Sequence, residues 1–200
     1  VAGLTVNTDG TWSFDPADTA YQSLAAGQPQ TLTIPVTVTD ATGATDTQNL
    51  TITLTGTNDI PTIGGVSTGS VTEDTAPSAS GQLTIADVDS GEAVFTPQSA
   101  VATTYGTFTV DTAGAWTYDV DNSNPAVQQL GANSPGLTDT ITVTSADGTP
   151  QQITVSIVGT NDAPTVASVI TGQAATEDAA FSFAVPQGTF ADIDTGDALT

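Results

Sequence analysis

LTITLTGTNDIPT at residues 50–62 returns as ITVSIVGTNDAPT at residues 153–165, 103 positions later. In both copies apolar residues alternate with Thr or Ser, and the run then stops at Gly-Thr-Asn-Asp. Alternation with a period of two is typical of a half-buried β-strand. We therefore expect each copy to be the last strand of a β domain, with Leu50, Ile52 and Leu54 facing a core.

Other segments recur at nearly the same spacing, which makes the period a whole domain. The matching pairs are TED at 72–74 and 176–178, ADVDSGE at 86–92 and ADIDTGD at 191–197, and GLTVNTDGTWSFD at 3–15 and GTFTVDTAGAWTYD at 106–119. A period of about 104 residues matches one compact domain and not a short solenoid turn. We expect three repeats: the C-terminal part of a first (1–60), a complete central one (61–163) and the N-terminal part of a third (164–200).

The strands, turns and aromatic residues indicate an all-β fold. Strand patterns at 31–39, 50–56, 137–145 and 153–159 are separated by Gly- and Asp-rich turns, and no long amphipathic helix is available for parallel crossovers. The pattern predicts a β-sandwich of about seven to eight strands per repeat. Two segments, 17–27 and 124–132, are expected to hold a helical turn each. The pairs Trp12/Phe14 and Trp116/Tyr118 are predicted core aromatics.

The amino-acid composition excludes most classes of catalytic and binding function. The chain has no Cys, His, Lys or Arg, and 22 acidic residues give it a net charge of −22. Thiol and imidazole catalysis, phosphate clamps, a basic nucleic-acid surface and a cationic membrane patch are therefore excluded. A paired-carboxylate glycosidase is the remaining catalytic alternative, but two Trp and three Tyr spread over three repeats imply no aromatic cleft. We expect no enzymatic activity, no nucleic-acid partner and no direct membrane insertion.

The acidic residues gather in recurring short motifs. Carboxylates without cationic partners stay in water or meet a metal ion, and Ca²⁺ takes about six to eight oxygen ligands, whereas Mg²⁺ demands a tighter octahedron. The alternative is that each motif is an ordinary solvated turn. Co-recurrence of the motifs favours Ca²⁺ ions that bridge neighbouring repeats. The candidate ligands are Asn58, Asp59, Glu73, Asp74, Asp87, Asp89 and Glu92, and their counterparts Asn161, Asp162, Glu177, Asp178, Asp192, Asp194 and Asp197.

The run from GTFTVDTAGAWTYD through DNSNPAVQQLG to GTNDAPT (106–165) resembles a VCBS repeat, which is similar to the cadherin-like repeats of large bacterial RTX-type adhesins. The resemblance implies tandem immunoglobulin/cadherin-like sandwiches in a cell-surface protein, exported by a type I system, outer-membrane associated and folded by external Ca²⁺. It implies adhesion and biofilm formation, with neighbouring repeats as partners and a host or abiotic surface bound through other domains. It places the junction positions on Asp59, Glu73, Asp74, Asp87 and Asp89 and their counterparts.

Three alternatives remain open at this point. A ligand-binding module for glycan or protein would need Tyr21, Phe95 or Tyr105 in solvent. An ice- or surface-binding face would use the Thr-x-Thr strands at 37–39 and 51–55, although Thr is also ordinary on the wet face of a sandwich. Homophilic contact is opposed by the negative surface unless Ca²⁺ screens it.

Overall fold

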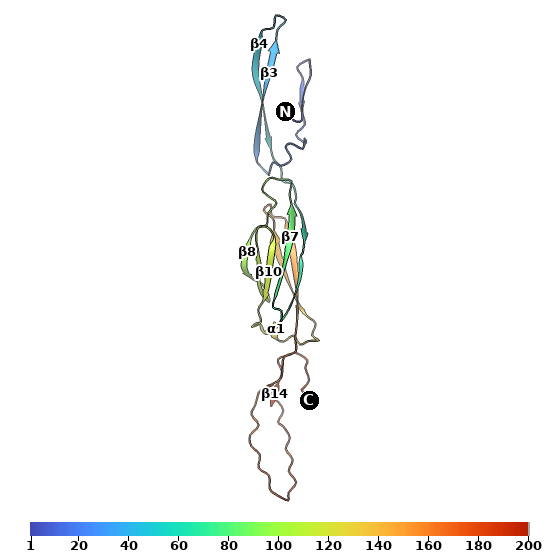
Figure 1. Cartoon of the computed structure of the whole chain (residues 1–200), viewed down its shortest axis with the longest axis vertical. Coiled ribbons are helices and arrows are strands. Elements are labelled where there is room, and N and C mark those ends of the chain that lie inside the picture. The colour runs from blue at the N-terminus through green and yellow to red at the C-terminus, as the bar shows by residue number, and fades with distance from the viewer. Residues whose placement is uncertain (200) are drawn as a thin grey trace.

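The protein is described here by a computed structural model of residues 1–199, in which three β parts lie in a row along one long axis (Figure 1). Two hairpins form the N-terminal end, a sandwich forms the middle, and residues 164–199 form the opposite end. Within the described residues no helix is both long and apolar enough to cross a membrane.

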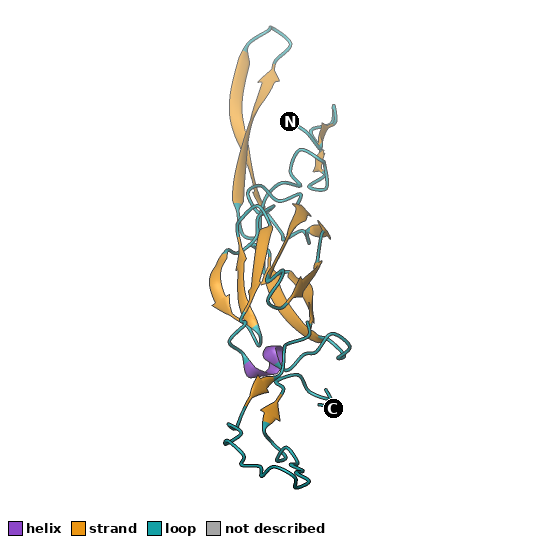
Figure 2. Ribbon diagram, turned by 60° about the horizontal axis from the view of Figure 1, so that its bottom comes forward, coloured by secondary structure: helices purple, strands orange, loops and turns teal. Residues whose placement is uncertain are grey.

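Strands make up nearly all of the regular structure (Figure 2). The N-terminal part holds β1 (Leu4–Val6), β2 (Trp12–Phe14), β3 (Pro29–Thr39) and β4 (Thr45–Thr55). The central part holds β5 (Thr62–Gly65), β6 (Thr68–Thr72), β7 (Ser78–Ala86), β8 (Gln98–Ala102), β9 (Gly106–Val110), β10 (Ala115–Val120), α1 (Pro125–Gln128), β11 (Leu137–Thr144) and β12 (Pro150–Val158). The C-terminal part holds β13 (Thr165–Val166) and β14 (Phe190–Ala191).

The central part is an eight-stranded sandwich, which confirms the predicted fold class. One sheet has the order β5-β7-β10-β9-β8 and the other has the order β11-β12-β6. Neighbouring strands are antiparallel except that β6 runs parallel to β12, with Thr72 opposite Val158. The chain therefore changes sheet between β5 and β6, and this change carries the residues after β6 to the C-terminal end of the sandwich.

The core between the two sheets is built on the aromatic pair of β10. Trp116 and Tyr118 are both buried, together with Phe95 and Phe108. The Trp116 indole Nε1 donates a 2.8 Å hydrogen bond to the carbonyl of Val66, at the point where the chain changes sheet. Its polar atom is thereby satisfied inside an apolar core.

Tyr118, the second aromatic residue of β10, hydrogen-bonds to the buried carboxylate of Asp139. The Tyr118 hydroxyl donates to Asp139 Oδ2 at 3.0 Å, and the Tyr105 amide donates to the same oxygen at 3.1 Å. Burial first, and the Asp139 charge second, raise the pKa of the Tyr118 phenol, so it remains a donor at neutral pH. Asp139 is buried among strands and does not belong to the acidic motifs singled out above.

The two ends of the chain are more open than the sandwich. Trp12, expected in a core, is 49% exposed, because within the described residues no strand pairs with β2 as β7 pairs with β10 beside Trp116. Tyr21 and Leu54 pack at the base of the N-terminal part, where the Tyr21 hydroxyl donates to the carbonyl of Ala2 at 2.8 Å. The helical turn expected at 124–132 is present as α1, capped by Asn124, whereas 17–27 forms successive turns.

Candidate metal centres

The first junction joins the end of β4 to the sandwich. Asp59 follows β4, and Asp87 and Asp89 follow β7, which returns to the linker because Ala86 pairs with Thr62. The Asp59 amide donates to Asp89 Oδ2 at 2.8 Å, and the Asp89 amide donates to Asp87 Oδ1 at 2.9 Å. Strand pairing thus brings the Asn-Asp linker and the Asp-x-Asp loop together, as the sequence predicted.

The second junction repeats this arrangement between β12 and the C-terminal part. The Asp162 amide donates to Asp194 Oδ2 at 2.8 Å, and the Asp194 amide donates to Asp192 Oδ1 at 3.0 Å. Carboxylate oxygens of Asp192, Asp194 and Asp197 all lie within 4.8 Å of one another. The two hydrogen bonds of the first junction therefore recur at the second, whereas the close cluster of three carboxylates is found within residues 1–199 at the second junction alone.

A backbone hydrogen bond also joins the neighbouring parts at each junction. The Ser90 amide donates to the carbonyl of Ser23 at 3.1 Å, and the Thr195 amide donates to the carbonyl of Gln129 at 3.0 Å. The donor comes from the loop that carries the Asp-x-Asp motif, and the acceptor from the turn that precedes the last two strands of the previous part. These bonds hold the acidic loop against the end of the previous part.

Glu73 and Asp74 lie at a different junction from the one their place in the sequence suggested. The sequence grouped them with Asp59, Asp87 and Asp89, but the parallel pairing of β6 with β12 carries them to the opposite end of the sandwich. There the Thr160 amide donates to Glu73 Oε1 at 3.0 Å. Glu73 is fully buried, and its own amide donates to the carbonyl of Val158.

Glu177 and Asp178 are accordingly absent from the second junction. They follow the counterpart of β6 in the C-terminal part and are exposed there. Asp178 and Asp74 share a left-handed backbone, with φ of 61° and 59°, so the residue after the Glu has the same conformation in both places.

Two residues that the motifs did not include belong to these sites. Asp147, in the β11–β12 turn, accepts from Asn58 Nδ2 at 3.2 Å across the first junction, and a hydrogen bond from the Ser145 hydroxyl lowers its pKa to about 2. Asn122, before α1, donates from Nδ2 to Asp74 Oδ1 at 3.1 Å at the second. Asp147 resembled an ordinary turn residue, so the sequence carried no signal for its role.

The remaining amide side chains of the linkers play a local role. Asn58 Nδ2 and Asn161 Nδ2 each donate to the carbonyl of the following Asp, at 2.9 and 2.7 Å. Both side chains are exposed and use their amide nitrogen to shape the turn.

Both junctions contain buried carboxylate oxygens without a hydrogen-bond partner. In residues 1–199 these atoms are Asp87 Oδ2, Asp89 Oδ1 and Glu92 Oε2 at the first junction, and Glu73 Oε2, Asp162 Oδ2 and Asp194 Oδ1 at the second; Asn122 Oδ1 is a further unpaired oxygen. An unpaired buried acceptor is costly, and an unpaired buried charge more so. The chain has no cationic side chain that could compensate them.

The pKa values of the junction carboxyls reflect this crowding. Desolvation, followed by repulsion from Asp74, Asp162 and Asp194, raises the pKa of Glu73. Desolvation also comes first for Glu92, whose pKa is raised further by Asp89, Asp87 and Asp147, and for Asp162, whose pKa is raised by Asp74, Asp194 and Asp192. Each cluster is therefore unfavourable when all its members are ionised and no cation is near. An all-oxygen donor set of this kind suits a hard divalent cation.

Comparison with known proteins identifies related domains. Residues 58–159 match the family model described as the bacterial cadherin-like domain, and residues 2–53 match the one described as the bacterial Ig domain. No curated protein matches the chain.

Solved structures that resemble parts of the chain include the following three. The human desmocollin-1 ectodomain is 14% identical with a TM-score of 0.33, over 80% of this chain and 28% of that one. PcdhgB3 EC1-4 is 15% identical with a TM-score of 0.36, over 83% and 41%. A Ca²⁺-stabilised adhesin that helps an Antarctic bacterium reach out and bind ice is 19% identical with a TM-score of 0.22, over 68% and 33%. This chain thus corresponds to less than half the length of each.

Proposed function

The chain belongs to the bacterial cadherin-like domain family, and from this premise we propose that it is a Ca²⁺-stabilised extender segment of an extracellular bacterial adhesin. Its repeats run over 1–60, 61–163 and 164–200, in the VCBS class of RTX-type adhesins. The parent protein leaves the cell by type I secretion and contributes to adhesion and biofilm formation. The families matched are structural modules, and we assign the chain no enzymatic activity.

One observation carries this proposal: unpaired, buried carboxylate oxygens gather at both junctions, where the same hydrogen bond from the linker Asp amide to the Asp-x-Asp loop recurs. We assign the first site to Asp59, Asp87, Asp89, Glu92 and Asp147. We assign the second to Glu73, Asp74, Asp162, Asp192, Asp194 and Asp197, with Asn122 beside it. Divalent metal bound there offsets the repulsion that raises the pKa values of Glu73, Glu92 and Asp162.

Backbone hydrogen bonds and the shared cation together account for the stiffness of the extender. The Ser90–Ser23 and Thr195–Gln129 backbone bonds already fix neighbouring parts at one point each. A cation shared between the linker carboxylate and the Asp-x-Asp loop adds a second attachment and removes hinge freedom. Binding to the folded form alone stabilises it by RT ln(1 + [Ca]/Kd), and extracellular sites of this type work at roughly 10⁻⁴–10⁻³ M.

The alternative of a glycan- or protein-binding module gains no support from its test residues. Phe95 and Tyr21 are buried and Tyr105 is half-buried against the core, so these three side chains do not form an exposed aromatic platform. Tyr105 also uses its amide to hold Asp139.

Calorimetry with millimolar Ca²⁺ and with chelator tests the proposal. We expect Ca²⁺ to raise the unfolding temperature of the chain, and the double substitution Asp87→Asn with Asp89→Asn to remove one class of binding sites while the second junction still binds. An unfolding temperature that is the same in Ca²⁺ and in chelator would falsify the metal assignment. Scattering in the two conditions tests stiffening: an equal maximum dimension and an equal hinge freedom would argue against it.

A further inference from the structure

Residues 59–74, here called the strap, connect the two junctions of the central sandwich. The strap leaves the Asn-Asp linker, pairs as β5 with β7, changes sheet, and pairs as β6 with β12. Thr62 lies opposite Ala86 beside the first junction, and Thr72 lies opposite Val158 beside the second. One continuous run of chain therefore spans the sandwich from junction to junction.

The last strand of the sandwich, β12, runs in the same direction as the strap. It starts after the β11–β12 turn, where Asp147 accepts from Asn58 at the first junction, and it ends just before the linker of the second junction. The N-terminal and C-terminal parts lie at opposite ends of the sandwich (Figure 1).

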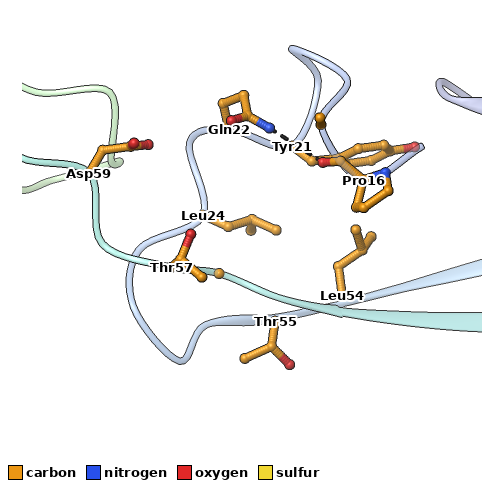
Figure 3. A pocket seen from close by; sticks show the side chains of 10 residues that line it. Pro16, Tyr21, Gln22, Leu24, Leu54, Thr55, Thr57 and Asp59 are labelled. Carbon is orange, nitrogen blue, oxygen red and sulfur yellow. Dashed lines mark hydrogen bonds between the residues drawn. The ribbon is translucent and has the colours of Figure 1, made fainter.

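The chain reaches the strap directly from the N-terminal part, because β4 continues through Thr57 to Asp59 (Figure 3). It leaves the sandwich from the end of β12. When the two ends of the chain are pulled apart, the strap is drawn toward the first junction and β12 toward the second. The two neighbouring strands are thus pulled in opposite directions, parallel to their own axes.

This direction of force loads all the hydrogen bonds of a pairing at the same time. β6 and β12 have five residue pairs in register, and β5 and β7 have four. When one strand slides along another, the bonds between them must lengthen together, whereas strands separated from one end lose their bonds one pair at a time. Sliding therefore has the higher barrier, because several bonds are broken before any is regained.

Further hydrogen bonds hold the strap at its middle and at its end. Where the chain changes sheet, the Val66 carbonyl accepts from the Trp116 indole at 2.8 Å, and the Val66 amide donates to the carbonyl of Gln82 at 2.8 Å. At the end of the strap, the buried Glu73 carboxylate accepts from the Thr160 amide at 3.0 Å. The strap cannot slide past β12 without breaking these bonds as well.

We propose that the strap is a shear clamp, which carries tension along the protein and keeps the central repeat folded under load. The clamp rests on the proposed function for the direction of the load, because an extender is stretched along its axis. Its resistance comes from the strand order and is present without metal. Cations at the junctions add to it, because they fix Asp59 at one end of the strap and Glu73 at the other.

Pulling the same sandwich in two directions tests the clamp by single-molecule force spectroscopy. The sequence has no Cys, so two introduced cysteines attach the handles at chosen positions of the 200-residue chain. Ile60→Cys with Ala163→Cys, at equivalent positions of the two linkers, pulls the strap against β12 in shear. Thr138→Cys with Ala163→Cys is the matched control, because it peels β12 from β11, where Thr138 lies opposite Ser156.

We expect the rupture force to be several-fold higher in shear than in peeling, both in Ca²⁺ and in chelator. Forced unfolding follows the barrier to unfolding along the direction of pulling. All three substituted positions are exposed, so the comparison isolates the direction of the force. Equal rupture forces in the two directions overturn the proposal.

Substitution of Glu73 tests the end of the clamp. In chelator, Glu73→Ala should lower the rupture force in shear, because the Thr160 amide loses its acceptor, whereas Glu73→Gln keeps an oxygen there and should retain most of the force. In peeling the Thr160 bond breaks singly, so Glu73→Ala should have little effect. A loss by the same factor in both directions would show that Glu73 stabilises the fold without holding the strap.

The outcome is separable from that of the proposed function. If Ca²⁺ raises the unfolding temperature but shear and peeling rupture at the same force, the metal sites stand and the clamp is wrong. If shear is the stronger direction but the unfolding temperature is the same in Ca²⁺ and in chelator, the clamp stands and the metal assignment is wrong.

Discussion

The backbone amide of Thr160 donates a 3.0 Å hydrogen bond to Oε1 of Glu73, although the two residues are 87 positions apart in the chain. The Glu73 carboxylate is fully buried, and its second oxygen has no partner. The Glu73 side chain, from the start of the sandwich, therefore lies at the second junction, where the charges of Asp162 and Asp194 repel its carboxylate.

The first prediction concerns the charge of Glu73. Glu73→Gln keeps an oxygen for the Thr160 amide but removes one negative charge from the crowded cluster. In chelator the variant should be at least as stable as the parent chain, because repulsion is relieved. In Ca²⁺ it should be less stable than the parent, because the carboxylate ligand is lost. Urea unfolding in both conditions measures the two effects.

The matched control for this substitution is Glu177→Gln, which makes the same change in the counterpart of Glu73. Glu177 is exposed, so neither condition should show an effect. A Glu73→Gln variant that loses as much stability in chelator as in Ca²⁺ would contradict a charge-based role.

The second prediction is the pH dependence without Ca²⁺. The pKa values of Glu73 and Asp162 are raised in the folded state above the usual 4.5 and 3.8, so the folded chain binds more protons than the unfolded chain between the usual and the raised values. Stability therefore falls as pH rises through this window and is greater below it. Thermal unfolding in chelator should show a higher midpoint near pH 4 to 5 than at pH 7, estimated from these reference values.

Asp147 acts in the opposite direction and at lower pH. Its pKa is about 2 in the folded state, so the stability it contributes is present above the usual 3.8 and is lost as pH falls toward 2.

The effect of Glu73 and Asp162 on the pH profile should depend on the metal. In Ca²⁺ the gain in stability that acidification produces in chelator should vanish, because protons compete with the metal for the same carboxylates. An identical pH profile in Ca²⁺ and in chelator would contradict this assignment.

The third prediction concerns the close packing around Trp116. A Cβ at Gly81 would lie 2.6 Å from the indole ring, and one at Gly69 would lie 2.9 Å from it. Gly81→Ala should therefore destabilise the sandwich by about 1–3 kcal/mol through overpacking. Gly172→Ala is the control, because no atom lies within 4 Å of the added Cβ. Equal midpoints of urea unfolding for the two variants would refute the packing argument.

The fourth prediction concerns the buried Tyr118–Asp139 pair. Tyr118→Phe leaves Asp139 Oδ2 with the Tyr105 amide as its partner, and should cost about 1–3 kcal/mol because a buried charge loses a donor. A double-mutant cycle with Asp139→Asn measures the coupling directly. A coupling free energy near zero would mean that the tyrosine acts only by filling space.

The sequence predicted the sandwich, and the closeness of Asp59 to Asp87 and Asp89, because both depend on short-range pattern. Alternating apolar residues define β11 and β12, and the paired aromatics of β10 are buried as expected. The Asp-x-Asp loops meet their Asn-Asp linkers because an antiparallel strand, β7 at the first junction and β14 at the second, returns beside the strand that follows the linker. Trp12 did not follow the pattern, because burial also needs a neighbouring strand such as β7, whose Gly81 lies against Trp116.

By itself the sequence determined the repeat, the all-β fold class and a set of carboxylates without Lys, Arg or His side chains to pair with, since these follow from residue types and spacing. Tertiary structure alone decided which carboxylates lie at the same junction. The parallel pairing of β6 with β12 moves Glu73 and Asp74 to the far end of the sandwich, and the β11–β12 turn brings Asp147 to Asn58. The pairing and register of distant strands determine which residues lie together. A short motif gives residue types and their spacing, but not the strand end beside which each residue will lie.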